Sequence, residues 1–405
     1  MNPIVIIGAG MAGFTVAREL RKIDKEIPLV ILTNDAGGFY SKPMLSNAFA
    51  QKKEAAQLVT QSAEQMAAQL GVTIQAGTHV TGIDTAGKSI STDAGLISYD
   101  KLVLAVGAQP IRLYIDGDGA NQVLSVNNVA DYARFRELVA LPKHGASARV
   151  TILGAGLIGC EFADDLAGAG HAVTLIDPSP LPLAALAAPT LSRGLQAALT
   201  TRGVEMHLST TATRIDRNGD SLQVTLADGN RIETDIVLSA VGLRPDLTIA
   251  TAAGLSTGRG ILIDATGQTS APDVYAVGDC AEYTIEVAGG AAPVTRILPY
   301  IAPLMTAARA IARTLTGTPT SIELKDSPVI VKTPSYPIAL VPPPVHALAT
   351  GRWEDEQTDA RTICRFYDDS GLMVGFCVAP QDAASRASLL GALGSPATTA
   401  ATDPS

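Results

Sequence analysis

A strand, a glycine-rich turn and a helix occur in this order at two places in the chain, and this repeat limits the folds open to it. The first copy comprises IVII at 4–7, GAGMAG and a helical run; the second comprises RVTIL at 149–153, GAGLIG and CEFADDLAGAG. Each turn has glycine-x-glycine-x-x-glycine spacing, which suits a tight turn, backbone approach to a pyrophosphate and close helix packing. The helix start offers free N–H groups to phosphates. Two complete copies predict two dinucleotide-binding units of the α/β class.

The two turns and the strands beside them contain the first predicted cofactor ligands, which are Gly8, Ala9, Gly10, Met11, Ala12, Gly13, Gly154, Gly156 and Gly159. An acidic residue that ends the second strand of such a unit accepts hydrogen bonds from an adenosine ribose. Asp177 holds this position in the second unit, and its carboxylate repels a 2′-phosphate, so NADH is favoured over NADPH. Thr33 holds it in the first unit. Asp35, two residues later, is either the ribose contact or a solvated turn residue.

Three further stretches suit a chain that runs beside a cofactor. YDKLVLAVGAQP and TDIVLSAVGLRPD are buried strands that end in glycine and then proline, so Gly107 and Gly242 are candidate cofactor contacts or ordinary turn residues. In APDVYAVGDCAE, Gly278 follows a strand and holds Asp279 where it can point into a polar cofactor tail. Asp279 is therefore a candidate ligand for ribityl hydroxyls or for waters on the phosphate side.

Composition excludes several classes of function. A length of 405 residues predicts two or three domains, and 47% apolar with 17% charged residues is typical of folded proteins. A net charge of -9 argues against binding to nucleic acid or anionic membranes. Four cysteines and five histidines show no metal-ligand spacing, and we interpret the cysteines as reduced thiols in a cytoplasmic protein. No apolar run is long enough to predict a membrane span, and the apolar start indicates a buried strand and helix.

Taken together, these motifs resemble the flavoprotein reductases with two dinucleotide-binding domains, over roughly residues 1–315. The resemblance implies that FAD is held by the first unit and the GDCA segment, and NADH by the second unit. Disulfide reductases carry a cysteine pair after the first unit, and related NADH oxidases carry one cysteine; YSKPMLS at 40–46 has neither. YSKPMLS, GAGLIGCEFADDL and VIVKTP most resemble the rubredoxin reductases, which pass electrons from NADH to rubredoxin for alkane hydroxylation.

The rubredoxin reductase resemblance also implies roles for individual residues. Lys42, whose backbone is restricted by Pro43, lies beside the flavin in this family, and its alternative is a surface lysine. Glu161 resembles the family glutamate that pairs with that lysine near the nicotinamide. Further flavin or adenine contacts are implied for Ile301, at the start of a helix expected from about residue 299, and for Lys332 and Val80.

The predicted domains are an FAD-binding domain of residues 1–114 and 241–318, an NADH-binding domain of 115–240, a C-terminal α+β domain of 319–391, and a disordered tail of 392–405. In the third domain we expect strands at PVIVKTP, YPIALV, RTICRFYD and LMVGFCVA, a tight hairpin turn at 369–371, and a closing helix at DAASRASLLGAL. The domain is shorter than the dimer-forming domain of disulfide reductases, which favours a monomer.

Rubredoxins are generally acidic, so an acidic reductase needs a local basic patch to meet one. We expect a small, salt-sensitive interface formed by Lys42, Lys332, Arg309 and Arg313, although the two arginines are also consistent with a solvated helix face. One alternative function is a ferredoxin reductase of a P450 or dioxygenase system, a class that usually has an arginine and paired prolines where this chain has SKP. Another is a flavoprotein that uses bound NADH to recruit other proteins, of the apoptosis-inducing factor type.

Overall fold

A computed structural model describes residues 2–141, 147–285 and 294–397 of the chain. The chain forms two compact units: unit 1 is Met1–Lys42, Ala56–Ile111 and Leu243–Lys325, and unit 2 is Pro43–Ala55, Arg112–Gly242 and Asp326–Ser405. The sequence-based division assigned residues 43–55 to the FAD-binding domain and 319–391 to a separate domain. In the structure residues 43–55 and the C-terminal segment from Asp326 pack within unit 2.

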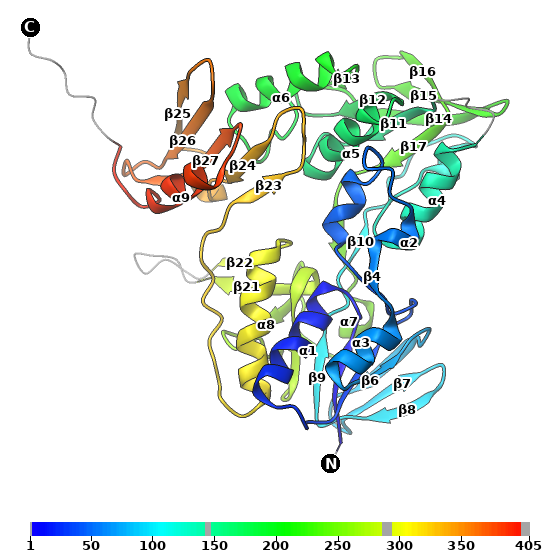
Figure 1. Ribbon diagram of the computed structural model, residues 1–405, viewed down its shortest axis with the longest axis vertical. Helices are drawn as coiled ribbons and strands as arrows, with labels where there is room; N and C mark the ends of the chain where they lie inside the picture. The colour runs from blue at the N-terminus through cyan, green and yellow to red at the C-terminus, as the bar shows by residue number, and fades with distance from the viewer. Residues whose placement is uncertain (1, 142–146, 286–293, 398–405) are drawn as a thin grey trace, which may run out of the picture. The chain divides into compact units, whose positions relative to one another are not determined.

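Unit 1 is built around a parallel five-stranded sheet in the order β20-β9-β1-β2-β5. Its strands are Ile4–Ile7 (β1), Leu29–Leu32 (β2), Thr73–Gln75 (β5), Lys101–Leu104 (β9) and Val274–Ala276 (β20). All four residues of β1 are buried, as a strand covered on both faces requires. The helices α1 (Met11–Ile23) and α8 (Ile301–Leu315) run side by side (Figure 1), and the Thr15 hydroxyl contacts the Met305 sulfur across them.

Shorter elements complete unit 1. The helices are α2 (Ala55–Leu58), α3 (Ala63–Leu70) and α7 (Thr248–Ala252). The strands are β3 (Phe39–Tyr40), β4 (Val59–Gln61), β6 (Val80–Asp84), β7 (Ser89–Thr92), β8 (Gly95–Ser98), β10 (Ala108–Pro110), β18 (Leu243–Pro245), β19 (Ile261–Ile263), β21 (Ala281–Ile285) and β22 (Val294–Ile297). β10 pairs antiparallel with β18, the two segments in which the sequence showed a strand ending in glycine and proline.

Unit 2 repeats the arrangement with a parallel sheet in the order β13-β12-β11-β17. Its strands are Arg149–Leu153 (β11), Ala172–Asp177 (β12), Glu205–Leu208 (β13) and Ile236–Ser239 (β17), and its helices are α4 (Val129–Val139), α5 (Leu157–Gly168) and α6 (Pro189–Thr201). An antiparallel sheet of β14 (Ala212–Asn218), β15 (Ser221–Leu226) and β16 (Arg231–Thr234) adjoins it.

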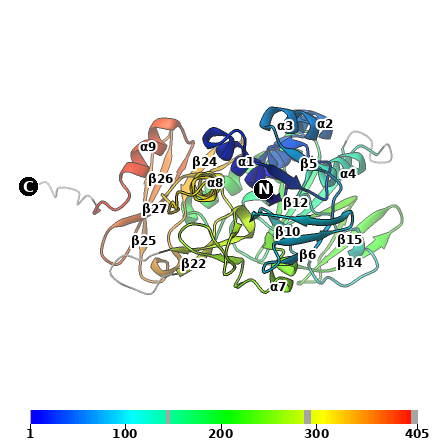
Figure 2. The same ribbon diagram turned by 90° about the horizontal axis from the view of Figure 1, so that it is seen from below.

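The C-terminal part of unit 2 is a five-stranded antiparallel sheet in the order β23-β24-β27-β26-β25. It consists of β23 (Val329–Val331), β24 (Ile338–Val341), β25 (Arg352–Gln357), β26 (Thr362–Tyr367), β27 (Met373–Ala379) and the helix α9 (Ala383–Gly391). Phe376 and Val378 pack in one core cluster with Leu389 of α9, and Figure 2 shows this helix beside β26 and β27. Cys377, between them, points to the other face and accepts the Ala188 N–H at the start of α6.

The predicted fold class, two Rossmann-like units with a small C-terminal α+β part, is confirmed. The four predicted C-terminal strands, the hairpin turn with Gly371 at φ +79°, and the closing helix are all present. The edge strand β25 was not predicted, because it is charged and mostly exposed and so shows no apolar alternation. Residues 392–397, at the start of the predicted tail, pack against the sheet, where Met373 donates its N–H to Ser395; residues 398–405 lie outside the described part.

Candidate dinucleotide-binding sites and a buried carboxylate cluster

The first glycine turn connects β1 to α1, and its three glycines meet different surroundings. A Cβ on Gly8 would lie 2.2 Å from the Ala105 carbonyl oxygen, and one on Gly13 would lie 2.0 Å from the Gly8 carbonyl oxygen. These two glycines are therefore required by the packing of the chain itself. A Cβ on Gly10, the residue that caps α1, would meet no atom within 4 Å. This open space lies beside the free N–H groups of the helix start and fits a pyrophosphate that approaches the backbone.

The second glycine turn, between β11 and α5, repeats this pattern. A Cβ on Gly159 would lie 1.8 Å from the Gly154 carbonyl oxygen, whereas one on Gly156 would meet no atom within 4 Å. Asp177 ends β12, and its carboxylate accepts the Ala155 N–H at 2.6 Å and the Ser179 N–H at 2.7 Å. The predicted ribose acceptor is thus held directly against the predicted pyrophosphate turn. This arrangement fits the adenosine half of a dinucleotide.

Asp279 lies in the 3₁₀ helix Gly278–Cys280, next to the first glycine turn. A Cβ on Gly278 would lie 2.9 Å from Ala12 Cβ, so the two segments are in close contact. Burial raises the pKa of Asp279, and the positive charge of Lys42 opposes part of this increase. Asp279 therefore lies in unit 1 beside the first glycine turn. The sequence predicted that this residue and this turn bind the same cofactor, FAD.

Other predicted contacts in unit 1 occupy loops and element ends. Asp35 follows β2 and is exposed; its Oδ1 accepts the Thr33 hydroxyl at 2.7 Å and the Gly37 N–H at 2.9 Å, so one oxygen stabilises the local turn. Gly107 follows β9 with φ +70°, and a Cβ there would meet no atom within 4 Å. These roles stay predictions.

Three more predicted residues lie at element ends. Val80 begins β6 and packs against the core of unit 1, and Ile301 begins α8 and is 49% exposed. Gly242, the last residue of the central segment of unit 2, has φ +113°. The contacts predicted for them with a cofactor stay predictions.

Lys42 begins a short 3₁₀ helix, Lys42–Asn47 (η1), and the boundary between the units falls within this helix, directly after Lys42. Ser46, near the end of η1, donates its hydroxyl to the Pro43 carbonyl at 3.3 Å and to a carboxylate oxygen of Glu161. The predicted partners Lys42 and Glu161 belong to different units, and their pairing stays a prediction.

Glu161 lies one turn into α5 and is fully buried. Its carboxylate accepts the Lys332 backbone N–H at 2.9 Å and forms an ion pair with the Lys332 ammonium. The Ser46 hydroxyl donates to it as well. Two segments far apart in the sequence, η1 and the loop after β23, therefore meet at one buried carboxylate of α5.

Two further buried acids on α5 were not identified in the sequence. Asp164 accepts the Ser335 N–H at 2.9 Å and pairs with the Arg202 guanidinium at 2.9 Å. Asp165 accepts the N–H groups of Phe49 and Ala50 at 2.7 and 3.1 Å. Acidic residues at 161, 164 and 165 of an otherwise apolar helix were the available signal, because carboxylates on a buried helix need partners.

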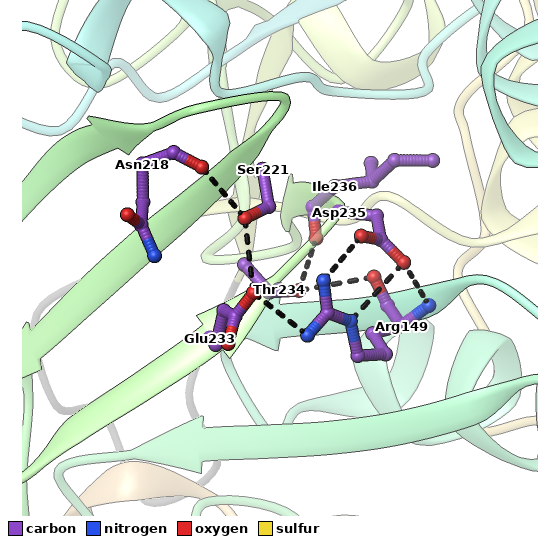
Figure 3. Close-up of polar contacts among 7 residues, drawn as sticks. All are labelled: Arg149, Asn218, Ser221, Glu233, Thr234, Asp235 and Ile236. Carbon is purple, nitrogen blue, oxygen red and sulfur yellow. Dashed lines mark hydrogen bonds and ion pairs between the residues drawn. The ribbon is translucent and has the colours of Figure 1, made fainter. Parts of the chain in front are cut away.

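A different ionic cluster lies at the amino ends of β11 and β17, away from the glycine turn. Asp235 accepts the Arg149 backbone N–H at 2.8 Å and pairs with its guanidinium at 2.7 Å, and Glu233 lies 3.1 Å from the same side chain (Figure 3). A cavity of about 340 Å³ borders Asp235 and Ile236. Dinucleotides bind at the carboxyl ends of parallel strands, so we assign this cluster a structural role.

The four cysteines are free and buried, and within the described ranges no group of three or more His, Cys, Asp or Glu could hold a metal ion. Burial raises the pKa of the Cys280 thiol to about 11 and also raises that of Cys160. In the part of the chain that the structure describes, no helix has the length and apolar character needed to cross a membrane.

Residues 2–294, which contain both glycine turns, match the family described as pyridine nucleotide-disulphide oxidoreductase. The chain belongs to the pyridine nucleotide-disulphide oxidoreductase family. Residues 321–393 match a second family, described as a rubredoxin binding C-terminal domain. The chain is therefore an oxidoreductase, and membership in this family implies dinucleotide cofactors.

Curated members of the family match almost the whole chain. The rubredoxin-NAD(+) reductase of Alcanivorax borkumensis is 42% identical over 93% of this chain and 95% of its own length, and that of Acinetobacter baylyi is 41% identical over 93% of both. The nitric oxide reductase FlRd-NAD(+) reductase of Aeromonas salmonicida is 40% identical over 83% of both. Among solved structures, the ferredoxin reductase for the CYP199A2 system of Rhodopseudomonas palustris has a TM-score of 0.83 at 26% identity, over 94% of this chain and 91% of its own.

Proposed function

We propose that this protein takes a hydride from NADH and passes single electrons to rubredoxin, as the first step of an electron supply for alkane hydroxylation. The observation that carries the proposal is the match of residues 321–393 to a rubredoxin-binding domain in a chain that also contains two dinucleotide turns. The rubredoxin-NAD(+) reductases that resemble the chain over 93% of its length support the same function.

The residues present fit FAD in unit 1 and NADH in unit 2. FAD would supply the conversion of a two-electron donor to one-electron steps. Gly10 leaves space for its pyrophosphate at the start of α1, and Asp279 would bind the polar tail next to this turn. Gly156 provides the same space for NADH, and Asp177 would accept from its ribose while repelling the 2′-phosphate of NADPH.

Lys42 and Glu161 have the proposed catalytic roles. The Lys42 ammonium would stabilise negative charge that develops on the flavin ring, as fixed positive groups do where charge forms in a reaction. Lys332 would add a second positive charge, and its ammonium is already oriented by Glu161. The buried Glu161 carboxylate would thus position Lys332, one of the two lysines proposed to lie beside the flavin.

No cysteine stands in the segment around Lys42, and the four thiols of the chain are buried elsewhere. Without a thiol in this segment, electrons would leave the flavin directly for an acceptor outside the chain. This supports rubredoxin, an iron protein, as the electron acceptor.

We further propose a transient complex with rubredoxin, of the weak electron-transfer type that buries less than about 1,200 Å². Arg309 and Arg313 are exposed on α8, one turn apart, and Arg309 lies 3.8 Å from Glu19. The Lys332 side chain is 24% exposed and forms an ion pair with Glu161. Because this pair partly neutralises the ammonium, Lys332 would attract rubredoxin less than an unpaired lysine would. Lys42 completes the proposed patch.

The remaining parts of the proposal concern organisation. We propose FAD-binding segments 1–114 and 241–318, an NADH-binding segment 115–240 and a C-terminal domain 319–391, and we propose that the protein is a monomer. Four unpaired cysteines support a reducing, cytoplasmic location. A second acceptor to test is FlRd, because a relative 40% identical to this chain is named FlRd-NAD(+) reductase.

The test is NADH oxidation by the purified flavoprotein with rubredoxin, with a [2Fe–2S] ferredoxin, and with oxygen alone. We expect rubredoxin to accelerate NADH oxidation far above the oxygen rate, and ferredoxin to be a poor substitute. Equal rates with both iron proteins, or no response to either, would overturn the proposed acceptor. Rapid mixing of enzyme with NADH separately reports flavin reduction, so a failure of the acceptor is distinguished from a failure of the hydride step.

A further inference from the structure

The segment that follows Lys42 is fastened to unit 2 by side chains whose purpose the proposed function leaves open. Phe49 lies between Tyr132 and Phe135 of α4, with ring centroids 5.4 and 5.3 Å away. The Tyr132 hydroxyl donates to the Lys53 carbonyl at 3.0 Å. Residues 43–55 therefore form one anchored stretch on α4 and α5, although the chain on both sides of it belongs to unit 1.

Asp165 is the polar centre of this anchor. Its Oδ2 accepts the Phe49 N–H at 2.7 Å and its Oδ1 accepts the Ala50 N–H at 3.1 Å, so both oxygens bind one peptide turn. Only 4% of the residue is exposed. An aspartate buried against aromatic rings costs desolvation energy, and an apolar side chain would avoid this cost only by leaving both N–H groups without an acceptor. Two backbone N–H groups fixed by one carboxylate give a geometric precision that an apolar contact lacks.

The fastened turn is close to Lys42 along the chain. The 3₁₀ helix η1 begins at Lys42 and ends at Asn47, two residues before Phe49. The Ser46 hydroxyl of the same helix is bound by Glu161. The Phe49–Ala50 turn and Lys42 therefore lie at opposite ends of one short stretch of chain, through which a displacement of the turn can reach the lysine.

We propose that Asp165 is a positioning residue for Lys42: it holds the Phe49–Ala50 turn, and through η1 it fixes the lysine where hydride transfer from NADH to the flavin requires it. This inference rests on the proposed function, in which Lys42 stabilises charge on the flavin. Asp165 itself touches neither cofactor in the proposal, since its two oxygens are occupied by the turn.

The first experiment is a double-mutant cycle that measures the rate constant of flavin reduction at saturating NADH. We expect Lys42→Met and Asp165→Asn each to slow reduction, the latter by roughly tenfold to a hundredfold, as misplacement of a catalytic group by about 1 Å does. In the Lys42→Met background, Asp165→Asn should add almost no further loss, because both act through one group. The NADH concentration for half-maximal rate should stay close to the wild-type value, since Asp177 and its turn are unchanged.

Asp235→Asn is the matched control. Asp235 also lies in unit 2 and also accepts a backbone N–H, that of Arg149, but at the opposite end of β11 from the glycine turn. We expect Asp235→Asn to lower thermal stability and to leave the rate of flavin reduction within about twofold of the wild type. Flavin content and melting temperature are recorded for every variant, so that a loss of fold is not read as a loss of rate.

A pH profile gives a readout that a purely structural anchor would not change. Burial raises the pKa of Asp165 to about 6, while the N–H groups of Ala50 and Phe49 lower it. The other charged groups near it are Asp164 on α5 and Arg136 on α4, and His171 packs on Phe49 with a pKa lowered by burial. Below about pH 6 the wild type should lose flavin reduction rate, and both Asp165→Asn and Lys42→Met should lack this acidic limb.

Three outcomes would overturn the inference: an Asp165→Asn rate equal to that of the wild type, the same fold-loss from Asp165→Asn with and without Lys42, or an acidic limb that persists in Lys42→Met. If Asp165→Asn does not accumulate with FAD, the wild-type and Lys42→Met profiles still decide. If NADH does not reduce the flavin of the wild type, the proposed function itself is wrong. This outcome is therefore distinct from a failure of the inference about Asp165.

Discussion

Lys332 donates both its backbone N–H and its ammonium to the carboxylate of Glu161, 171 residues earlier in the chain. Glu161 is fully buried, and the Lys332 side chain is 24% exposed. The pair joins α5 to the loop between β23 and β24. Glu161 lies in the region that matches the first family, residues 2–294, and Lys332 lies in the region that matches the second, residues 321–393.

The first prediction concerns this ion pair. Glu161→Gln should destabilise the protein by about 3 kcal/mol, because it leaves the Lys332 ammonium beside a neutral group in a largely buried place. Lys332→Met should do the same by leaving the carboxylate unpaired. The double variant should lose clearly less than the sum of the two, as denaturant unfolding of all four proteins would measure. Strictly additive losses would show that the pair contributes no coupling.

The second prediction separates the glycines of each turn. Gly10→Ala should fold and lose bound flavin, because its Cβ enters the open space proposed for the pyrophosphate. Gly13→Ala should fail to fold or melt far lower, because its Cβ would lie 2.0 Å from the Gly8 carbonyl oxygen. Flavin content per chain and melting temperature measure the two effects. A Gly10→Ala protein with full flavin would contradict the assigned site.

The third prediction concerns the choice of nicotinamide cofactor. Asp177→Asn removes the charge that repels a 2′-phosphate and gives up one of the two N–H contacts, with Ala155 or Ser179. The ratio of kcat/KM for NADH to that for NADPH should fall on the order of tenfold, equivalent to about 1.4 kcal/mol. Steady-state kinetics with both cofactors measure the ratio. An unchanged ratio would place the ribose contact elsewhere.

The fourth prediction is a pH dependence of stability. The pKa of Asp165 is raised to about 6 in the folded protein, above its value in the unfolded chain. The folded state therefore binds the proton more tightly, and the contribution of Asp165 to stability is present at low pH and is lost as pH rises through about 6. The free energy of unfolding of the wild type minus that of Asp165→Asn should therefore increase by up to about 3 kcal/mol when the pH is lowered from 7 to 4.

Urea unfolding of both proteins across this range would measure the difference. Asp235→Asn provides the reference for general acid effects on unit 2. A difference between the wild type and Asp165→Asn that is flat in pH would show that the Asp165 carboxyl titrates at its ordinary pKa, and one that shrinks on acidification would show a lowered pKa; either contradicts the prediction.

The fifth prediction concerns the cysteines. All four thiols are buried, and burial raises the pKa of Cys160 and of Cys280. The thiolate is the reactive form, so a thiol reagent should modify the native protein very slowly and leave NADH oxidation intact. After unfolding, each chain should react with four equivalents of the thiol reagent, one for each cysteine. Rapid inactivation by alkylation would indicate a redox thiol and contradict an electron route through the flavin alone.

The glycine turns could be predicted because their signal is local. Strand, turn and helix follow each other within about twenty residues. Glycine is required in the turn wherever a Cβ would overlap with a nearby backbone atom, as at Gly13 and Gly159. The hairpin at 369–371 was predicted for the same reason. The charged edge strand β25 was missed because its exposed residues carry no apolar period.

The partners of the buried acids could not be predicted. Asp165 binds a turn 116 residues earlier, and Glu161 binds a lysine 171 residues later, so no spacing within the sequence connects them. The sequence by itself determined the two dinucleotide units, because local sterics and side-chain periodicity specify them. Only the tertiary structure decided that residues 43–55 pack with unit 2 and that Lys332 is paired with Glu161, because burial of a carboxylate selects whichever donors the folded chain brings within reach.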